Sequence, residues 1–254
     1  MQDFRPALAR TFVLGVALAW NLPLVLGAED ELSFGIATGY SSRAVFRGVE
    51  RAASAWQTAL EGDADSWRGA IRSTRPFDSA APEELSSALG YVWKWGAAFT
   101  LDAWGTHFWY VNQPVVGAPA HSFEADLRLT WTSRNGWRLG LMTSHDIRFR
   151  ADSIESSIEY DLMLGSWGTY LQLRAYAGYV AAKDVLPDAA GPQLSDDYSY
   201  GGVDLRLPYH FSYHSSVAVE AHHALTRNQT KAWSPLGSSS GFRQWISVSY
   251  RYDF

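Results

Sequence analysis

Serine and histidine residues are the first candidates for chemistry in this sequence, because a hydrolase needs a nucleophile and a base within hydrogen-bond reach of each other. His222 and His223 are adjacent, so they point to opposite faces of an extended strand. His222 shares its face with Glu220, but this i, i+2 spacing is typical of residues that line a barrel wall and not of a catalytic triad. Residues 237–241 read GSSSG and fit the pattern G-x-S-x-G, yet they lie in a Ser/Gly-rich loop without the helix that a nucleophile elbow requires. The sequence therefore predicts that the protein is not an enzyme.

Metal-binding and cofactor-binding patterns are missing from the sequence as well. The chain has no cysteine, which excludes a thiolate metal site and a disulfide scaffold. It contains no H-E-x-x-H pair, no glycine-rich phosphate loop and no EF-hand loop. The net charge of −5 gives no general attraction to nucleic acid. We expect no metal, no cofactor and no nucleic-acid partner.

Charged side chains within strand-like segments form a larger candidate set. Acids and bases are about evenly matched, and they are candidates to line a wet interior: Arg47, Arg68, Arg72, Lys94, Asp102, Glu124, Asp126, Arg128, Arg138, Glu155, Glu159, Asp161, Arg174, Asp204, Arg206 and Glu220. Unpaired buried charge is costly, so the first interpretation is that these groups pair across the interior. The alternative is a transverse field that sorts solutes, with acids on one wall and arginines on another.

The elements that must position these residues are β-strands. In the segment SFEADLRLTW, residues 122–131, apolar and polar side chains alternate strictly, and the same holds for residues 32–40 and 153–164. A period of two gives each strand one apolar face and one polar face. About twelve such segments follow one another, and no stretch of comparable length has a convincing helical period.

The connections between these segments alternate in length. Short turns such as SRNG and GSWG alternate with longer connections rich in Pro, Gly, Ser and Asp, such as residues 75–85 and 183–197. A soluble sandwich has no reason to keep this alternation, whereas an outer-membrane barrel has short periplasmic turns, longer outer loops and an even number of strands. We therefore expect an all-β fold: a single antiparallel transmembrane β-barrel of about 12 strands over residues 29–254.

The N-terminus has the layout of a secretory signal peptide. Arg5 and Arg10 precede an apolar run from about Phe12 to Leu26, and Gly27-Ala28 supplies small residues at the expected cut. The run is shorter than the roughly 20 residues that a spanning helix needs, and Asn21 and Pro23 interrupt it. Residues 1–28 are therefore predicted to be a signal peptide.

A family resemblance rests on the segment GYSSRAVFRGVE, residues 39–50. Its aromatic-Arg-Gly triplet, Phe46-Arg47-Gly48, follows the first strand, and the segment resembles the N-terminal signature of the TorF-type porins, a bacterial family. The acidic residue usual just before the Tyr is replaced here by Thr38-Gly39. The resemblance implies a signal peptide, an outer-membrane barrel and a porin role, and no catalytic residues. We expect this segment to be the exit of the first strand, an outer loop and the entry to the second strand, which starts near Arg43 or Ala55. In the plain interpretation, Phe46 is interfacial and the arginines pair with lumen acids or with surface lipid phosphates. The sharper alternative places Arg47 at the pore mouth as an anion-attracting charge.

The C-terminal segment QWISVSYRYDF alternates strictly and ends on Phe254. A last strand of this kind resembles the assembly signal of bacterial outer-membrane proteins, which implies that the barrel assembly machinery reads Tyr250, Tyr252 and Phe254. The expected location is the bacterial outer membrane of a Gram-negative cell, with outer-membrane lipid and small solutes as further partners. The expected function is porin-like passive diffusion of small solutes. The alternatives are a non-conducting structural or adhesive barrel with a plugged lumen and, third, a barrel lipid hydrolase with its site at the outer rim.

Overall fold

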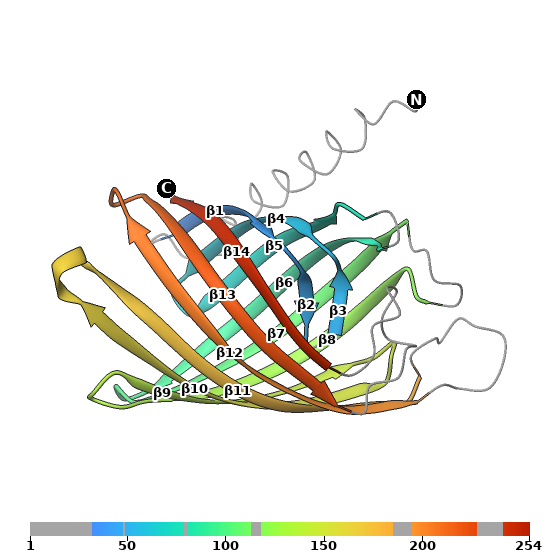
Figure 1. Cartoon of the computed structure of the whole chain (residues 1–254). Coiled ribbons are helices and arrows are strands. Elements are labelled where there is room, and N and C mark those ends of the chain that lie inside the picture. Colours follow the sequence, from blue (N-terminus) through green and yellow to red (C-terminus); the bar gives the residue numbers. More distant parts are fainter. Residues whose placement is uncertain (1–31, 48, 79–80, 113–117, 185–194, 228–240) are drawn as a thin grey trace.

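The computed structural model describes residues 32–47, 49–78, 81–112, 118–184, 195–227 and 241–254. Within these ranges, twelve strands form one closed antiparallel barrel (Figure 1). The predicted fold class and strand number are therefore confirmed. The predicted signal peptide, residues 1–28, lies outside the described residues, as do positions 237–240 of the GSSSG segment.

The barrel wall is built from strands that pair with their neighbours in chain order. The wall strands are β1 (Leu32–Ser41), β4 (Ala55–Ala64), β5 (Trp67–Pro76), β6 (Glu83–Trp95), β7 (Phe99–Val111), β8 (His121–Thr132), β9 (Trp137–Asp146), β10 (Ala151–Leu164), β11 (Thr169–Ala182), β12 (Asp196–His210), β13 (Ser215–Arg227) and β14 (Gly241–Asp253). β14 pairs antiparallel with β1, from Gly35 opposite Asp253 to Ser41 opposite Ser247, and closes the ring. Closure leaves no unpaired strand edge in the wall.

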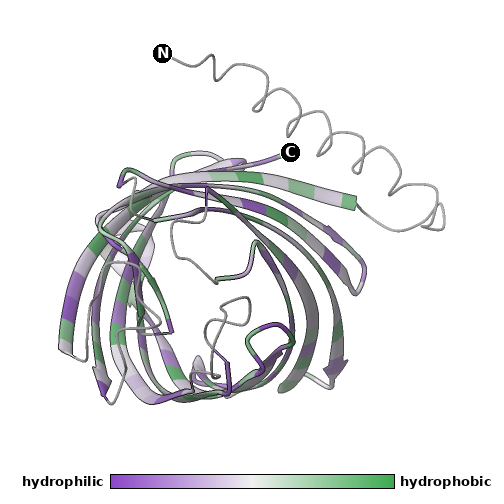
Figure 2. Cartoon of the chain, turned by 90° about the vertical axis from the view of Figure 1, so that its right-hand side faces the viewer, coloured by the Kyte–Doolittle hydropathy of each residue, from purple (hydrophilic) through white to green (hydrophobic). Residues whose placement is uncertain are grey.

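The two faces of each strand differ as the period of two predicts. On β8, Phe123, Leu127 and Leu129 are exposed on the outside of the ring, while Glu124 is buried on the inside. Viewed from the end that carries the longer connections, the strands form a ring in which hydrophobic and hydrophilic positions alternate (Figure 2). The structure thus settles a point that the sequence left open, because the charged face is the one that points inward. Among the described residues, no helix is long and apolar enough to cross a membrane.

Short and long connections lie at opposite ends of the barrel (Figure 1). The connections at one end are all short, residues 65–66, 96–98, 133–136, 165–168 and 211–214, and Gly165–Trp167 forms the 3-10 turn η2. At the other end, residues 147–150 between β9 and β10 are equally short. The Asn-Gly signal at residues 135–136 does produce a tight turn, in which Gly136 has a φ of 84°. The expected alternation of connection lengths is therefore present except at residues 147–150.

The segment after β1 does not continue the wall. β2 (Ala44–Phe46) and β3 (Val49–Ala52) pair with each other in a separate two-stranded sheet, and β4 begins only at Ala55. Of the two expected starts of the second wall strand, Ala55 is confirmed and Arg43 is wrong. Arg47 has a φ of 46°, which places it in the turn between β2 and β3 rather than on an extended face.

The hairpin β2–β3 packs inside the ring. Val49 is 1% exposed and clusters with Val180 of β11 and with Tyr198 and Tyr200 of β12. A second cluster joins Ala44 and Ala52 of the hairpin with wall residue Ala55 and with Ala81. Small alanine side chains allow the hairpin to lie close to the wall, and burial of Val49 stabilises it there by roughly 1.5–3 kcal/mol.

Candidate functional site

The barrel encloses a lumen cavity of about 700 Å³. It is lined by the hairpin and by lumen-facing side chains of the wall strands, and its lining mixes arginines, carboxylates and aromatic rings. A cavity of this volume lies in the range of small-molecule sites. The lumen cavity is therefore the place where a solute could be held or passed.

The side chain of Arg47 bonds the hairpin to the far wall of the barrel. Its guanidinium donates from Nη1 to Glu124 Oε2 at 2.6 Å and from Nη2 to Ser144 Oγ at 2.5 Å, and it lies 3.5 Å from Asp126 Oδ1. Glu124 and Asp126 belong to β8 and Ser144 to β9, which lie about half-way round the ring from β1, where the hairpin begins. The turn therefore joins one side of the barrel to the other.

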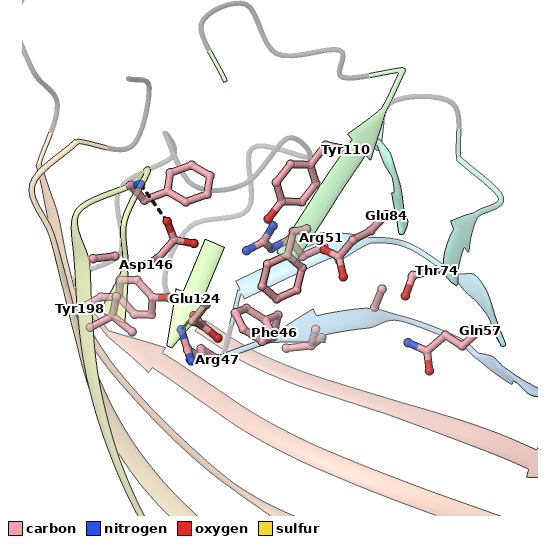
Figure 3. Close-up of a pocket in the computed structure, with 16 residues that line it drawn as sticks. Phe46, Arg47, Arg51, Gln57, Thr74, Glu84, Tyr110, Glu124, Asp146 and Tyr198 are labelled. Atoms are coloured by element: carbon pink, nitrogen blue, oxygen red, sulfur yellow. Dashed lines mark hydrogen bonds and ion pairs between the residues drawn. The ribbon is translucent and has the colours of Figure 1, made fainter. Parts of the chain in front are cut away.

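Phe46 at the tip of the hairpin lies between two guanidinium groups. The Cζ atom of Arg47 is 4.7 Å from the centroid of the Phe46 ring and that of Arg51 is 5.3 Å from it. Arg51 points toward Tyr110 and Glu84 (Figure 3). Both cations sit within cation–π range of the ring. The three side chains form the inner end of the hairpin and also line a smaller pocket of about 140 Å³.

Charge pairing keeps Arg47 protonated. Burial opposes the charge of the guanidinium, but the attraction and hydrogen bond of Glu124, with smaller contributions from Tyr200 and Asp126, raise the pKa of Arg47 above its ordinary value. The side chain of Arg47 is 11% exposed and that of Glu124 is 6% exposed, so water screens this pair little. Arg47 is thus not a free charge at a pore mouth but half of an ion pair inside the lumen.

Ion pairs also tie the wall strands together on the lumen side. Arg174 donates to Glu155 at 2.6 Å and to Asp204 at 3.2 Å, so one guanidinium joins β10, β11 and β12. Arg138 donates to both oxygens of Asp161, at 2.7 and 2.8 Å. Further pairs are Arg68 with Asp63 and Asp102, Arg72 with Glu61, Arg206 with Glu220, and Arg251 with Glu61 and Asp253. Pairing across neighbouring strands is therefore the dominant arrangement of these charges.

The predicted pore-lining residues divide into two groups. Those that line the lumen cavity are Arg47, Arg68, Arg72, Asp102, Glu124, Asp126, Arg128, Glu155, Arg174, Asp204 and Glu220. Those that do not line it are Lys94, Arg138, Glu159, Asp161 and Arg206. Glu159 and Asp161 are held by Arg138, and Arg206 by Glu220. A role of either group in conduction stays a prediction.

A grouping that the sequence did not indicate lies on β12, β13 and β14. His222 Nδ1 is 2.8 Å from Asp204 Oδ1 and His222 Nε2 is 3.0 Å from Ser247 Oγ. All three side chains line the lumen cavity. The signal that could have found them is the register of the two last hairpins, which sets Asp204 opposite His222 and Glu220 opposite Ser247. Within the described ranges, no group of three or more His, Asp or Glu residues is arranged to hold a metal ion.

Comparison with known proteins identifies the architecture. No family model matches the chain, and no curated protein matches it. Among solved structures, a KdgM porin in complex with disordered oligogalacturonate matches with a TM-score of 0.56 and 9% identity, over 87% of this chain and 99% of that chain. A NanC porin matches with a TM-score of 0.53 and 11% identity, over 86% of this chain and 98% of that chain. The fold is that of outer-membrane porins.

Proposed function

We propose that this chain is an outer-membrane porin-like channel through which small hydrophilic solutes diffuse passively. The observation that carries the proposal is the lumen cavity of about 700 Å³, lined by charged and polar side chains inside a closed ring with an apolar outer face. An apolar exterior suits lipid, and a wet, charged interior suits solutes in water. The porin fold of the similar structures supports this reading.

The hairpin β2–β3 is the constriction in this proposal. It crosses the lumen and is fixed at its far end by Arg47, so the space beside Phe46 and Arg47 sets the size of a passing solute. The same observation favours a second candidate, a barrel whose lumen the hairpin plugs. The two differ in whether water and ions pass the hairpin.

Charge selectivity is expected to be weak. Seven carboxylates and six arginines line the lumen cavity, and most of them pair with one another. A near balance of this kind neither attracts nor excludes anions strongly. The KdgM structure holds oligogalacturonate, but the balanced lumen of this chain gives no reason to propose an acidic solute here.

Location and assembly form the remaining part of the proposal. We infer a bacterial outer-membrane location, an export signal in residues 1–28, and reading of the last strand, with Tyr250, Tyr252 and Phe254, by the barrel assembly machinery. The outward position of Tyr250 and Tyr252 on β14, which seals the ring against β1, supports a role for this strand in assembly. Membership of the TorF-type porins rests only on residues 39–50.

Conductance in a planar lipid bilayer tests the channel. The full mature chain is compared with a variant in which a tight turn replaces residues 42–54, since Ser41 and Ala55 already face each other in the β1–β4 ladder. We expect small conductance steps from the wild type and larger steps from the variant. Conductance from the variant alone would identify a plugged barrel. If neither protein conducts, although heat-modifiable gel mobility shows that both are folded, the channel proposal is overturned.

A further inference from the structure

Ser247, His222 and Asp204 lie on three adjacent strands and face the same space. Asp204 on β12 is directly opposite His222 on β13, and Ser247 lies two residues beyond Trp245, the partner of His222 on β14. One ring nitrogen of His222 is 2.8 Å from the carboxylate and the other is 3.0 Å from the hydroxyl. Nucleophile, base and orienting acid within these distances are the geometric signature of a serine hydrolase triad, whatever their order in the chain.

We propose that these three residues form a nucleophilic site that hydrolyses small, water-soluble carboxylic esters in the lumen. Ser247 Oγ attacks the carbonyl carbon while its proton passes to Nε2 of His222. The C–O bond to the alcohol then breaks, and His222 returns the proton to the leaving oxygen. Water, deprotonated by His222, attacks the acyl group on Ser247, releases the carboxylic acid and restores the serine hydroxyl. Asp204 accepts from Nδ1 and orients the ring.

The surroundings fix the base and its partner. The imidazole of His222 stacks on the indole of Trp245, with centroids 4.6 Å apart and planes 10° apart. The second oxygen of Asp204 accepts from Arg174 Nη1 at 3.2 Å, which holds the carboxylate in place. The side chains of His222 and Asp204 are 13% and 18% exposed, so the pair is shielded but reachable from the cavity. Glu220 lies 3.5 Å from His222 Nε2, where it favours the protonated ring that forms after attack.

The position of the site defines its substrate class. It faces the lumen cavity and not the lipid side of the barrel, so its ester must arrive in water and fit a space of about 700 Å³. Ser247 lies inside β14, which pairs with β13 on one side and β1 on the other, so the backbone donors around it belong to these ladders. A backbone oxyanion hole is therefore not built beside Ser247, and we expect slow turnover with a readily trapped acyl or phosphonyl serine.

Two probes test the proposal on the full mature chain, refolded in lipid. The first is a fluorophosphonate, which loses fluoride as its phosphorus bonds to a nucleophilic serine oxygen. The second is p-nitrophenyl acetate, whose hydrolysis releases a coloured product. We expect mass spectrometry to find the phosphonyl group on Ser247, and Ser247→Ala or His222→Asn to lower the enzyme-dependent hydrolysis by about 10²-fold or more.

Matched variants separate chemistry from folding. Ser249→Ala removes a hydroxyl from the same face of the same strand, and His223→Asn changes the neighbouring histidine, which bonds Gln244 on the opposite face. Both are expected to hydrolyse and to label as the wild type does. An unlabelled Ser247 in folded protein, or equal hydrolysis by Ser247→Ala and Ser249→Ala, would overturn the site. Conductance of the wild type, measured in parallel, separates the two proposals: conductance without labelling of Ser247 would overturn the site alone, and labelling without conductance would overturn the channel alone.

Discussion

The guanidinium of Arg47 meets the carboxylate of Glu124 at 2.6 Å across the lumen, although 77 residues separate them in the chain. Arg47 belongs to a turn between two short strands, and Glu124 to the opposite wall. This contact anchors the turn of the hairpin to the far wall and pairs two buried charges in the lumen.

Replacing Arg47 with alanine should change conduction in two ways. Glu124 and Asp126 lose their shared cation, so the lumen should prefer cations more strongly. The hairpin also loses its far anchor, so conductance should rise. Reversal potentials in a salt gradient measure the first effect and single-channel steps the second.

The control for this experiment is Arg68→Ala, which removes a lumen arginine from the wall and leaves the hairpin untouched. Its ion preference should shift in the same direction, while its conductance step should stay near the wild-type value. Equal conductance steps in the two variants would show that the anchor does not limit the passage.

A double-mutant cycle on Arg47 and Glu124 should reveal strong coupling. Loss of Arg47 leaves the buried Glu124 without its cation, and loss of Glu124 leaves Arg47 with Asp126 at 3.5 Å as its acidic partner. Arg47→Ala and Glu124→Ala should each lower the free energy of unfolding by about 3 kcal/mol. The double variant should lose less than the sum of the two. Urea unfolding in lipid vesicles measures these changes. The Arg75–Glu83 pair, at 3.4 Å and largely exposed, is the comparison, and its coupling should be below about 1 kcal/mol. Additive losses at Arg47 and Glu124 would contradict the contact.

Substitution of Gly90 by any residue with a side chain should destabilise the barrel. A Cβ at this position would lie 2.5 Å from the indole ring of Trp104, which lines the lumen cavity. Gly90→Ala must displace that ring, and we expect a loss of about 1–3 kcal/mol in the free energy of unfolding together with a change in Trp fluorescence. Gly69→Ala is the matched control, because its Cβ would have only a backbone oxygen within 4 Å, at 3.9 Å. If Gly69→Ala proved equally damaging, the cause would be the strand backbone and not Trp104.

A single arginine substitution on either face of β10 should distinguish its outward face from its inward face. Ile158 is 41% exposed on the outer face near the middle of the strand, and Ser157 is its lumen-facing neighbour. Ile158→Arg should destabilise the lipid-embedded barrel by about 2–4 kcal/mol, as expected for an arginine at the bilayer midplane. Ser157→Arg should be tolerated, since Glu155 and Glu159 share its face. Equal stability of the two variants in vesicles would argue against a lipid-facing exterior.

The wall strands could be predicted because the signals that define them lie within short stretches of the sequence. Alternation such as that of residues 122–131 defines strand and face together, and turn residues such as Asn135-Gly136 mark where strands end. The number of strands followed from these local signals. The inward direction of the charged face did not, because alternation is the same whichever face points in.

The hairpin and the serine site could not be predicted because they depend on distant partners. Residues 43–49 place arginine and valine on one face without a clean polar–apolar alternation, and the contacts of Arg47 with Glu124 and of Val49 with Val180 show that the segment folds inward. Along β13 itself, the same-face neighbour of His222 is Glu220, a spacing typical of a barrel wall. Its partners Asp204 and Ser247 lie on neighbouring strands, so the register across two hairpins had to be known.

The ring has one seam, where the last strand meets the first, and the hairpin is bound to that seam. Glu50 of β3 lies 3.5 Å from Arg243 of β14, and Ser42 donates its backbone N–H to Ile246 of the same strand at 2.9 Å. Synthesis runs from the N-terminus, so the hairpin is made long before β14. The contacts of Glu50 and Ser42 with β14 can therefore form only once the last strand is in place, so the seating of the hairpin in the lumen and the closure of the ring depend on the same strand.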